Sequence, residues 1–281
     1  MRSTAREPGA VRRWEVARPP VPVRTPGVRM AGFRDRGPGP VDVRVVPHPA
    51  VTLALGFGDG PLVVDADTGR RKRGSLVTGF MHGALRVRGE HVECVQARLS
   101  PPTAYAVLGV SPAELDGAVV TLDDLWGRDA ARIRERLGEA RSWRERFAMT
   151  DDLLARRCAT GRPVDPRVAW AWERIVARGG RVRIDDLAAG AGWSRKRLWS
   201  RFRAQIGLSP KRAARLVRFD HAAHLLAAGG DAARIAAESG YTDQSHLHRD
   251  VVAFSGVTPV AVADTAWLAV DGLAWAGHRP G

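Results

Sequence analysis

The stretch 184–202, IDDLAAGAGWSRKRLWSRF, constrains the fold of this chain more than any other segment. Its first part has apolar residues at positions i, i+3 and i+4, the spacing of one face of a short helix. Two glycines follow, and Ser194 is a typical N-cap for a second helix. The glycines expected to form the turn are Gly190 and Gly192. This order of elements predicts a helix-turn-helix.

The second helix of this unit is strongly basic. Leu198 and Phe202 lie four residues apart on one face and suffice for a core. The remaining positions are Arg195, Lys196, Arg197, Trp199, Ser200, Arg201 and Arg203. Like charges three and four residues apart repel, so this helix is expected to have an external anionic partner. The 24 residues from Arg195 to Arg218 contain nine basic side chains and no acidic one, which indicates DNA phosphate.

The composition sets wider bounds. A chain of 281 residues is long enough for two domains. Its net charge of +14 is weak evidence by itself, because 41 of the 44 basic residues are Arg, which also fits a GC-rich genome. No apolar run is long enough to span a membrane, and the N-terminus lacks the apolar core of a signal peptide. Two cysteines suit a reducing compartment, so we expect a cytoplasmic protein that does not enter the membrane.

The N-terminal part is expected to be mostly β-structure. Residues 1–20 are rich in Pro and Arg and predict a flexible arm, and residues 21–160 predict a regulatory domain. Between residues 41 and 99, short β-rich runs alternate with glycine-containing turns about every ten residues, which predicts an antiparallel barrel or sandwich. His91 and Glu93 share one face of a strand, with His82 nearby, but no His-x-His pair supports a metal site. No metal and no cofactor are predicted.

Helices are expected after the β-region. The predicted segments are 101–108, a start at Ser111–Glu114, 128–140 and 142–158. These helices either form a dimer interface or pack back on their own β-domain. A linker, ATGRP, is expected at 159–163, before a C-terminal DNA-binding domain over residues 161–281.

A second helix-turn-helix is predicted further along the chain. A helix from Asp165 to about Arg178 precedes the first unit, and a long helix capped by Ser209 follows it. About 18 residues at 1.5 Å each span roughly 27 Å, which is comparable with one turn of B-DNA. Residues 232–239, Gly240 and residues 243–254 then repeat the helix, turn and helix pattern. Two units at this spacing can read two successive major grooves.

Residues 165–260 resemble the DNA-binding domain of the AraC family of bacterial transcription regulators. The matching stretches are LAAGAGWSRKRLWSRF, GLSPKR, RIAAESGYTDQSHLHR and GVTP. The resemblance implies an α+β chain with an N-terminal cupin-like barrel, trailing helices and an all-α double helix-turn-helix domain. It also implies sequence-specific binding to double-stranded DNA, a small-molecule effector or a homodimer through the β-domain, and contact with RNA polymerase if the protein is an activator.

The resemblance also assigns roles to residues. Base contacts fall on Lys196, Trp199, Ser200, Gln244, Ser245, His248 and Arg249, which are also the outward positions of the two predicted helices. We assign phosphate contacts to Arg195, Arg197, Arg201, Arg203, Lys211 and Arg212.

The chain departs from the family pattern in its second unit. Val251 stands where the family usually has an aromatic residue, which predicts a looser core, and no Tyr-Arg pair follows the Thr-Pro. Residues 219–281 contain seven acidic and three basic side chains, so the second unit is expected to bind DNA weakly and the first to anchor.

Two alternatives stay open at this point. One is a small-molecule sensor whose DNA binding is weak and mainly electrostatic, and the other is an enzyme fused to a DNA-binding unit. No catalytic residue is predicted, because the chain has no recognisable nucleophile, phosphate-loop or paired-carboxylate motif. It also lacks the cysteine motifs of the DNA-repair methyltransferase that carries a similar unit.

Overall fold

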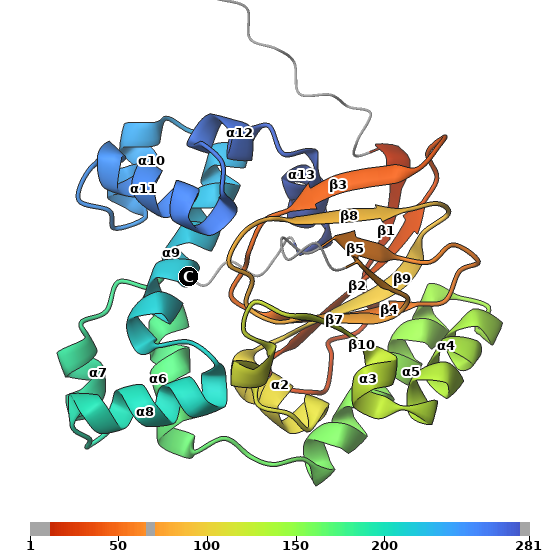
Figure 1. Cartoon of the computed structure of the whole chain (residues 1–281), viewed down its shortest axis with the longest axis horizontal. Helices are drawn as coiled ribbons and strands as arrows, with labels where there is room; N and C mark the ends of the chain where they lie inside the picture. The colour runs from red at the N-terminus through yellow and green to blue at the C-terminus, as the bar shows by residue number, and fades with distance from the viewer. Residues whose placement is uncertain (1–11, 66–70, 276–281) are drawn as a thin grey trace, which may run out of the picture.

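The computed structural model describes residues 12–65 and 71–275 of the chain. Figure 1 shows a β-rich lobe beside a helical lobe, with the green helices of the middle of the chain covering the β-rich lobe on its outer side. The helical lobe is built from the C-terminal part of the chain. None of the helices in these described ranges is long and apolar enough to cross a membrane.

The β-rich lobe contains two antiparallel sheets. The six-stranded sheet has the order β1-β2-β9-β4-β7-β10 and the four-stranded sheet the order β3-β8-β5-β6. The strands of the first are β1 Trp14–Ala17, β2 Val28–Asp35, β9 Glu93–Leu99, β4 Val51–Gly56, β7 Leu76–Thr78 and β10 Val119–Thr121. The strands of the second are β3 Val41–Val45, β8 Leu85–Gly89, β5 Val63–Asp65 and β6 Arg71–Arg73. Successive side chains of a strand point to opposite faces of its sheet, so in both sheets the alternate apolar residues lie on the face that packs against the other sheet.

The predicted antiparallel β-domain is confirmed, but its strands do not close into one barrel. Within the described ranges, the two ladders meet only at an isolated bridge between Gly60 and Val92. The edge strands β6 and β10 have three residues each, so they offer too few backbone groups for a continuous ladder between the sheets. The domain is therefore an open pair of packed sheets.

The predicted flexible arm is wrong for its last residues. Strand β1 pairs with β2, with Trp14 opposite Asp35 and Ala17 opposite Gly32. Trp14 is buried and packs edge-on against Phe33, at 6.3 Å between ring centroids. Burial of the indole contributes to ordering this short strand, and the Pro- and Arg-rich composition gives no sign of it. The rest of the predicted arm, residues 1–11, lies outside the described residues.

The helices after the β-region are α2 Pro101–Leu108, the 3₁₀ helix η1 Pro112–Leu115, α3 Leu122–Trp126, α4 Arg128–Glu139 and α5 Trp143–Thr160. All of them except α3, which has no predicted counterpart, lie close to the predicted segments. Ser111 and Glu114 form a capping box at the start of η1. Helix α5 packs on the first sheet where Gly32 leaves room for the ring of Trp143.

The helical lobe contains seven helices within the described residues. They are α6 Pro166–Ala177, α7 Ile184–Gly190, α8 Arg195–Ile206, α9 Pro210–Ala227, α10 Ala232–Glu238, α11 Gln244–Ser255 and α12 Pro259–Ala263. Its core includes Leu198, Phe202 and Phe219, which have no exposed surface. Helix α9 runs through the middle of the lobe and packs against α6, α8, α10, α11 and α12.

The last described helix, α13 Ala266–Ala274, packs against both lobes. The sequence assigned residues 161–281 to the DNA-binding domain, whereas α13 packs on β1 and β3 of the β-rich lobe as well as on α9. Trp267 lies 5.4 Å from both Trp14 and Phe33, measured between ring centroids. Helix α13 thus returns to the first strands, where Trp267 and Val270 are buried.

Candidate nucleic-acid interface

Helices α7 and α8 form the first helix-turn-helix. The side chain of Ser194 accepts a hydrogen bond from the backbone N–H of Arg197, so it caps α8 as expected. Gly192 has a positive φ of 65° and makes the turn. Gly190 does not: it ends α7, and its missing side chain leaves room for the ring of Trp170.

Helix α8 separates its core side chains from its outward ones. Leu198 and Phe202 are fully buried, while Lys196, Trp199 and Ser200 are exposed. Trp199 keeps half of its surface accessible, which is unusual for a residue of this size. The outward face of α8 is therefore available to a partner.

The basic residues around α8 have neighbours that hold them in place. Arg195 forms an exposed ion pair with Asp185 of α7. Arg203 lies over the ring of Trp199, 5.4 Å from its centroid, and Arg197 lies 5.3 Å from that of Trp193. Arg201 and Lys211 are exposed, and Arg212 is half-buried. The positive charge is thus presented on the exposed surface of α8 and the start of α9, although Asp185 offsets the charge of Arg195.

Helices α10 and α11 form the second unit. Asp231 and Asp243 cap them, and Gly240 makes the turn with a φ of 74°. The predicted base-contact residues are all exposed on α11: Gln244, Ser245, His248 and Arg249. The Arg249 Nε donates to the backbone oxygen of Ser245 at 3.3 Å, so this guanidinium lies along its own helix.

The core of the second unit is closed despite the small residue at position 251. Val251 has no exposed surface. Phe254, one turn further on, stacks on Phe219 of α9 with ring centroids 5.1 Å apart and planes at 27°. The burial of Val251 and the stack of Phe254 on Phe219 leave this part of the core closed, so the expected loosening is not seen.

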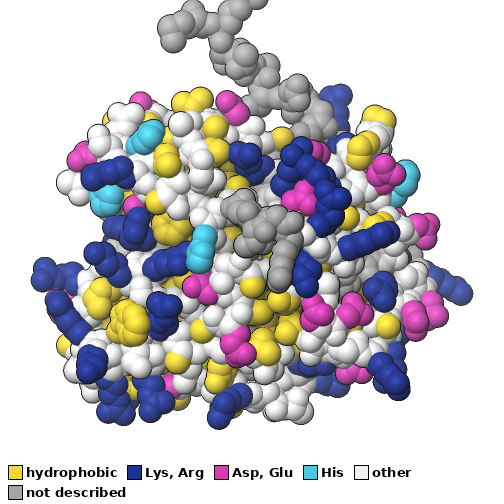
Figure 2. Space-filling view, viewed as in Figure 1, with side chains coloured by type: hydrophobic (Ala, Val, Ile, Leu, Met, Phe, Trp, Pro, Cys, Tyr) yellow, Lys and Arg dark blue, Asp and Glu magenta, His cyan; other side chains and the backbone are white. Residues whose placement is uncertain are grey.

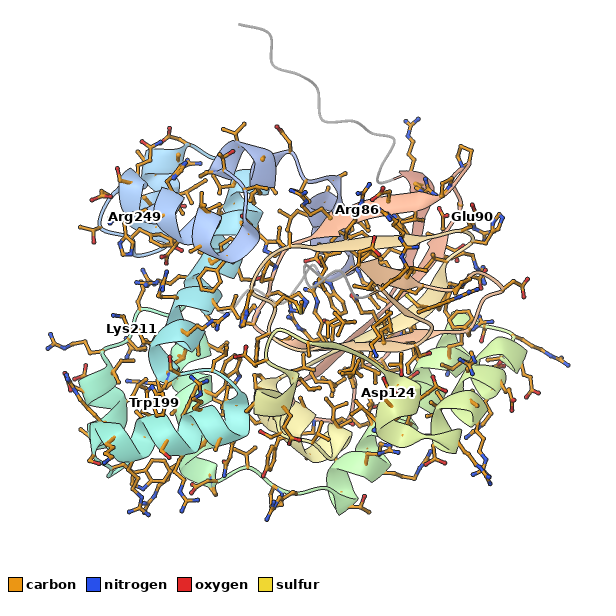
Figure 3. All side chains as sticks on the ribbon, in the orientation of Figure 1. Arg86, Glu90, Asp124, Trp199, Lys211 and Arg249 are labelled. Carbon is orange, nitrogen blue, oxygen red and sulfur yellow. The ribbon has the colours of Figure 1, made fainter. Side chains whose placement is uncertain are left out.

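Helix α9 fixes the two units relative to each other. It has 18 residues, and Ser209 caps it. The Arg215 guanidinium donates to the buried Asp250 carboxylate at 2.7 Å, which ties α9 to α11. Hydrogen bonding to Asp250 raises the pKa of Arg215. Figure 3 places Arg249, Lys211 and Trp199 one below the other over the helical lobe, on elements α11, α9 and α8.

A hollow that the sequence did not reveal lies beside the start of α9. Its volume is about 290 Å³. It is lined by His82 of the β-rich lobe together with Ser209, Lys211, Arg212, Arg215, Ala253 and Phe254. The His82 Nε2 is hydrogen-bonded to the Asp116 carboxylate at 3.0 Å. His82 is far from α9 in the sequence, so no local pattern could have placed it beside the start of that helix.

The charge of the lobe is uneven. Figure 2 shows dark-blue Lys and Arg side chains gathered over the lower left part, around α8 and the start of α9, and fewer over the upper left part that holds α10 and α11. Cyan and magenta side chains, which are histidines and acids, also lie in that upper part. The difference agrees with the charge counts of the sequence.

The β-rich lobe touches the first unit directly. Helix α8 packs on η1 and α2, and the Ser111 hydroxyl donates to the backbone oxygen of Ala204 at 2.6 Å.

No group of three or more metal-ligating side chains occurs in the parts of the chain that the structure describes. His91 and Glu93 do not converge with further ligands there.

Comparison with known proteins identifies the helical lobe. A family model described as a helix-turn-helix domain matches residues 187–264, which run from α7 to just past α12. The C-terminal part of the chain is an AraC-type helix-turn-helix domain. The chain is accordingly a DNA-binding transcription regulator.

The solved structures that match the chain are distant from it in sequence. ToxT from Vibrio cholerae is 11% identical, with a TM-score of 0.47 over 86% of this chain and 98% of that one. The C-terminal domain of the response regulator AraT from Geobacillus stearothermophilus is 22% identical, with a TM-score of 0.35 over 36% and 87% of the two chains. The AraC-like activator CuxR is 17% identical, with a TM-score of 0.25 over 68% and 80%. No curated protein matches the chain.

Proposed function

We propose that this regulator binds a specific double-stranded DNA sequence by reading two successive major grooves. The observation that carries the proposal is the pair of helix-turn-helices held on α9, each with a polar, exposed outward face. An α9 of 18 residues is about 27 Å long, close to the rise of one turn of B-DNA. Both recognition helices can then enter the same face of one duplex.

The outward residues of the two helices divide by chemistry. Arg249 and Gln244 can form bidentate contacts with guanine and adenine, each worth about 1–3 kcal/mol of discrimination. The proposed base contacts are Lys196, Trp199, Ser200, Gln244, Ser245, His248 and Arg249. The proposed phosphate contacts are Arg195, Arg197, Arg201, Arg203, Lys211 and Arg212. The phosphate contacts add affinity and salt dependence and position the helices, but they carry little sequence information.

The two units contribute unequally in this proposal. The nine basic residues between Arg195 and Arg218 surround the first unit, while acidic residues outnumber basic ones after Phe219. In addition, Arg215 is held by Asp250 at 2.7 Å and is less available to phosphate. The first unit anchors the complex and the second adds discrimination.

The β-rich lobe supplies regulation in this proposal. Its two packed sheets are suited to a small-molecule effector, and its outer helices α4 and α5 to a second copy of the chain. RNA polymerase is a further partner if the protein activates transcription. The place of action is the cytoplasm, where the DNA of a bacterial cell lies.

Selection of bound sequences from a random duplex pool, repeated across salt concentrations, tests the DNA-binding part. We expect an enriched site with two elements about one helical turn apart. A steep salt slope without an enriched motif would instead favour the second candidate function, an effector sensor with mainly electrostatic DNA binding. That candidate rests on the crowding of positive charge around α8 alone.

A further inference from the structure

The two sheets of the β-rich lobe enclose a cavity of about 80 Å³. Its walls are mostly aliphatic and aromatic and come from both sheets, for example Phe33 of β2 and Val87 of β8. Within the described ranges, no Asp, Glu, Lys or Arg side chain lines it. A charged ligand would lose its hydration without gaining a counter-ion, so these walls favour an uncharged molecule.

One end of the cavity is polar. His48 and Gln96 line it, and the His48 Nδ1 and the Gln96 Oε1 are buried without a hydrogen-bond partner. The other imidazole nitrogen of His48 is 3.0 Å from the Thr52 hydroxyl. Burial, and then the charge of Arg98, lower the pKa of His48 well below its usual value, so the ring is neutral at pH 7. Buried polar atoms without partners are costly, and a ligand hydroxyl or amide would satisfy them.

Trp267 closes the cavity from outside the β-domain. The other lining residues belong to the strands or to the loops between them, whereas Trp267 is carried by α13, which follows the helix-turn-helix domain. Its ring contacts Trp14 and Phe33, and 7% of the residue surface is exposed. Part of the cavity wall is therefore supplied by an element that does not belong to the two sheets.

The size of the cavity makes this element decisive. An engineered protein cavity of about 150 Å³ binds benzene, and this cavity has about half that volume. The strands around it are fixed by their ladders, while α13 is a separate helix of nine residues. A ligand of benzene size or larger is accommodated most easily by moving Trp267 aside.

Helix α13 is also tied to the helix that separates the two DNA readers. Asp271 forms a buried ion pair with Arg98 of β9, and its carboxylate lies 3.1 Å from the His224 Nε2 of α9. Trp275 donates from its indole nitrogen to the same carboxylate at 3.1 Å. A displacement of α13 breaks contacts on both lobes at once.

We propose that this cavity binds a small, uncharged, mainly apolar molecule with a hydrogen-bonding group, and that the ligand displaces Trp267 and loosens α13 from the β-domain. The ligand satisfies the polar end at His48 and Gln96 and takes the space of the indole. Occupancy of the β-domain is thereby transmitted through α13 to α9. This inference rests on the proposed role of the β-domain as the effector-binding part.

The test uses the full chain without DNA and two probes of similar size but different charge, benzyl alcohol and benzoate. Calorimetry measures their affinities for the wild type, Trp267→Ala and the control Trp170→Ala, which removes a half-exposed indole of α6. Benzyl alcohol is expected to bind Trp267→Ala at least ten-fold more tightly than the wild type or the control, because no indole has to be displaced. Benzoate is expected to bind none of the three.

Hydrogen exchange of the wild type provides the second measurement. Benzyl alcohol is expected to accelerate exchange of the amides in 266–274 and to leave those of α8 unchanged. Ala54→Leu fills the cavity from β4 and is expected to abolish both the binding of benzyl alcohol and the faster exchange in 266–274. This variant tests the proposal if Trp267→Ala does not fold. Equal affinity for the wild type and Trp267→Ala, or binding with unchanged exchange in α13, overturns the proposal. Because no DNA is present, failure here and failure of the sequence selection are separate results.

Discussion

Arg249 and Arg201 are both exposed and both lie on outward helices, but they have different surroundings. Arg249 lies on α11 among Gln244, Ser245 and His248, which are polar side chains suited to base edges. Arg201 lies on α8 among other arginines, which is a surrounding suited to phosphate. One charge is expected to specify sequence and the other to attract any duplex.

Replacing these two residues separates the roles. Arg249→Ala is expected to relax specificity at one base pair of the selected site, at a cost of about 1–3 kcal/mol on that site. Arg201→Ala is expected to weaken selected and scrambled duplexes alike and to reduce the salt slope by about 1. Binding isotherms on both duplexes at several salt concentrations give the comparison. Equal losses of the two variants on a scrambled duplex would contradict the assignment.

His224 predicts a pH dependence of folding stability. Burial lowers the pKa of His224, but the hydrogen bond to Asp271 and the charge of Asp220 outweigh it and raise this pKa to about 9. A folded pKa above the unfolded value of about 6.5 means that protonated His224 stabilises the fold fully below pH 6.5 and that this gain is lost as pH rises through 9. With the side chain one-third exposed, we expect a loss of about 1–2 kcal/mol across that range.

Urea unfolding at pH 6.5, 8 and 9.5 measures this loss. The matched control is His224→Gln, which keeps a hydrogen-bond donor toward Asp271 but does not titrate, so the difference between the two proteins is expected to shrink as pH rises. A difference that stays constant over this range would show that His224 is neutral in the folded chain.

At the scale of elements, two glycines have opposite consequences. Gly192 has a φ of 65° in the turn of the first unit, so Gly192→Ala is expected to destabilise the chain by about 1 kcal/mol even though open space surrounds it. Gly272 lies inside α13, has no heavy atom near the position of an added Cβ, and does not have a positive φ. Gly272→Ala is expected to stabilise α13 by about 0.5–1 kcal/mol.

Thermal unfolding of the two variants checks the signs. Gly272→Ala has a second consequence if α13 has to move for a ligand to enter: it is expected to weaken benzyl alcohol binding while the chain becomes more stable. Tighter binding in the more stable variant would argue against that movement.

Elements with a local signal could be predicted from the sequence. The caps Ser194, Ser209 and Asp243 and the turn at Gly240 lie where the pattern places them, because capping depends on residues within one helical turn. Strands β1, β6 and β10 were missed, since three or four residues carry little alternation. Gly190 was misassigned because the ring that it accommodates, Trp170, lies 20 positions away in the sequence.

At the scale of the whole molecule, the return of α13 to the β-domain could not be predicted. Arg98 and Asp271 are 173 positions apart, and each reads in the sequence as an ordinary surface charge. Only the assembled fold buries both and makes their pairing necessary. The outward residues of α8 and α11 could be predicted, because a helix exposes positions by its period alone, whereas their contacts with DNA bases stay a prediction.

The uneven charge of the helical lobe leads to the last prediction, which concerns the two halves of the selected DNA site. The half read by the first unit is identified as the one whose base preference changes in Lys196→Ala. Scrambling that half is expected to reduce affinity by at least ten-fold more than scrambling the other half, because the basic residues around α8 hold the adjacent phosphates only when α8 is seated in its groove. Competition binding with the two half-scrambled duplexes at one salt concentration measures the ratio. Equal losses would mean that α11 anchors the complex as firmly as α8 despite its acidic surroundings, and the charge distribution would then have no part in ranking the two units.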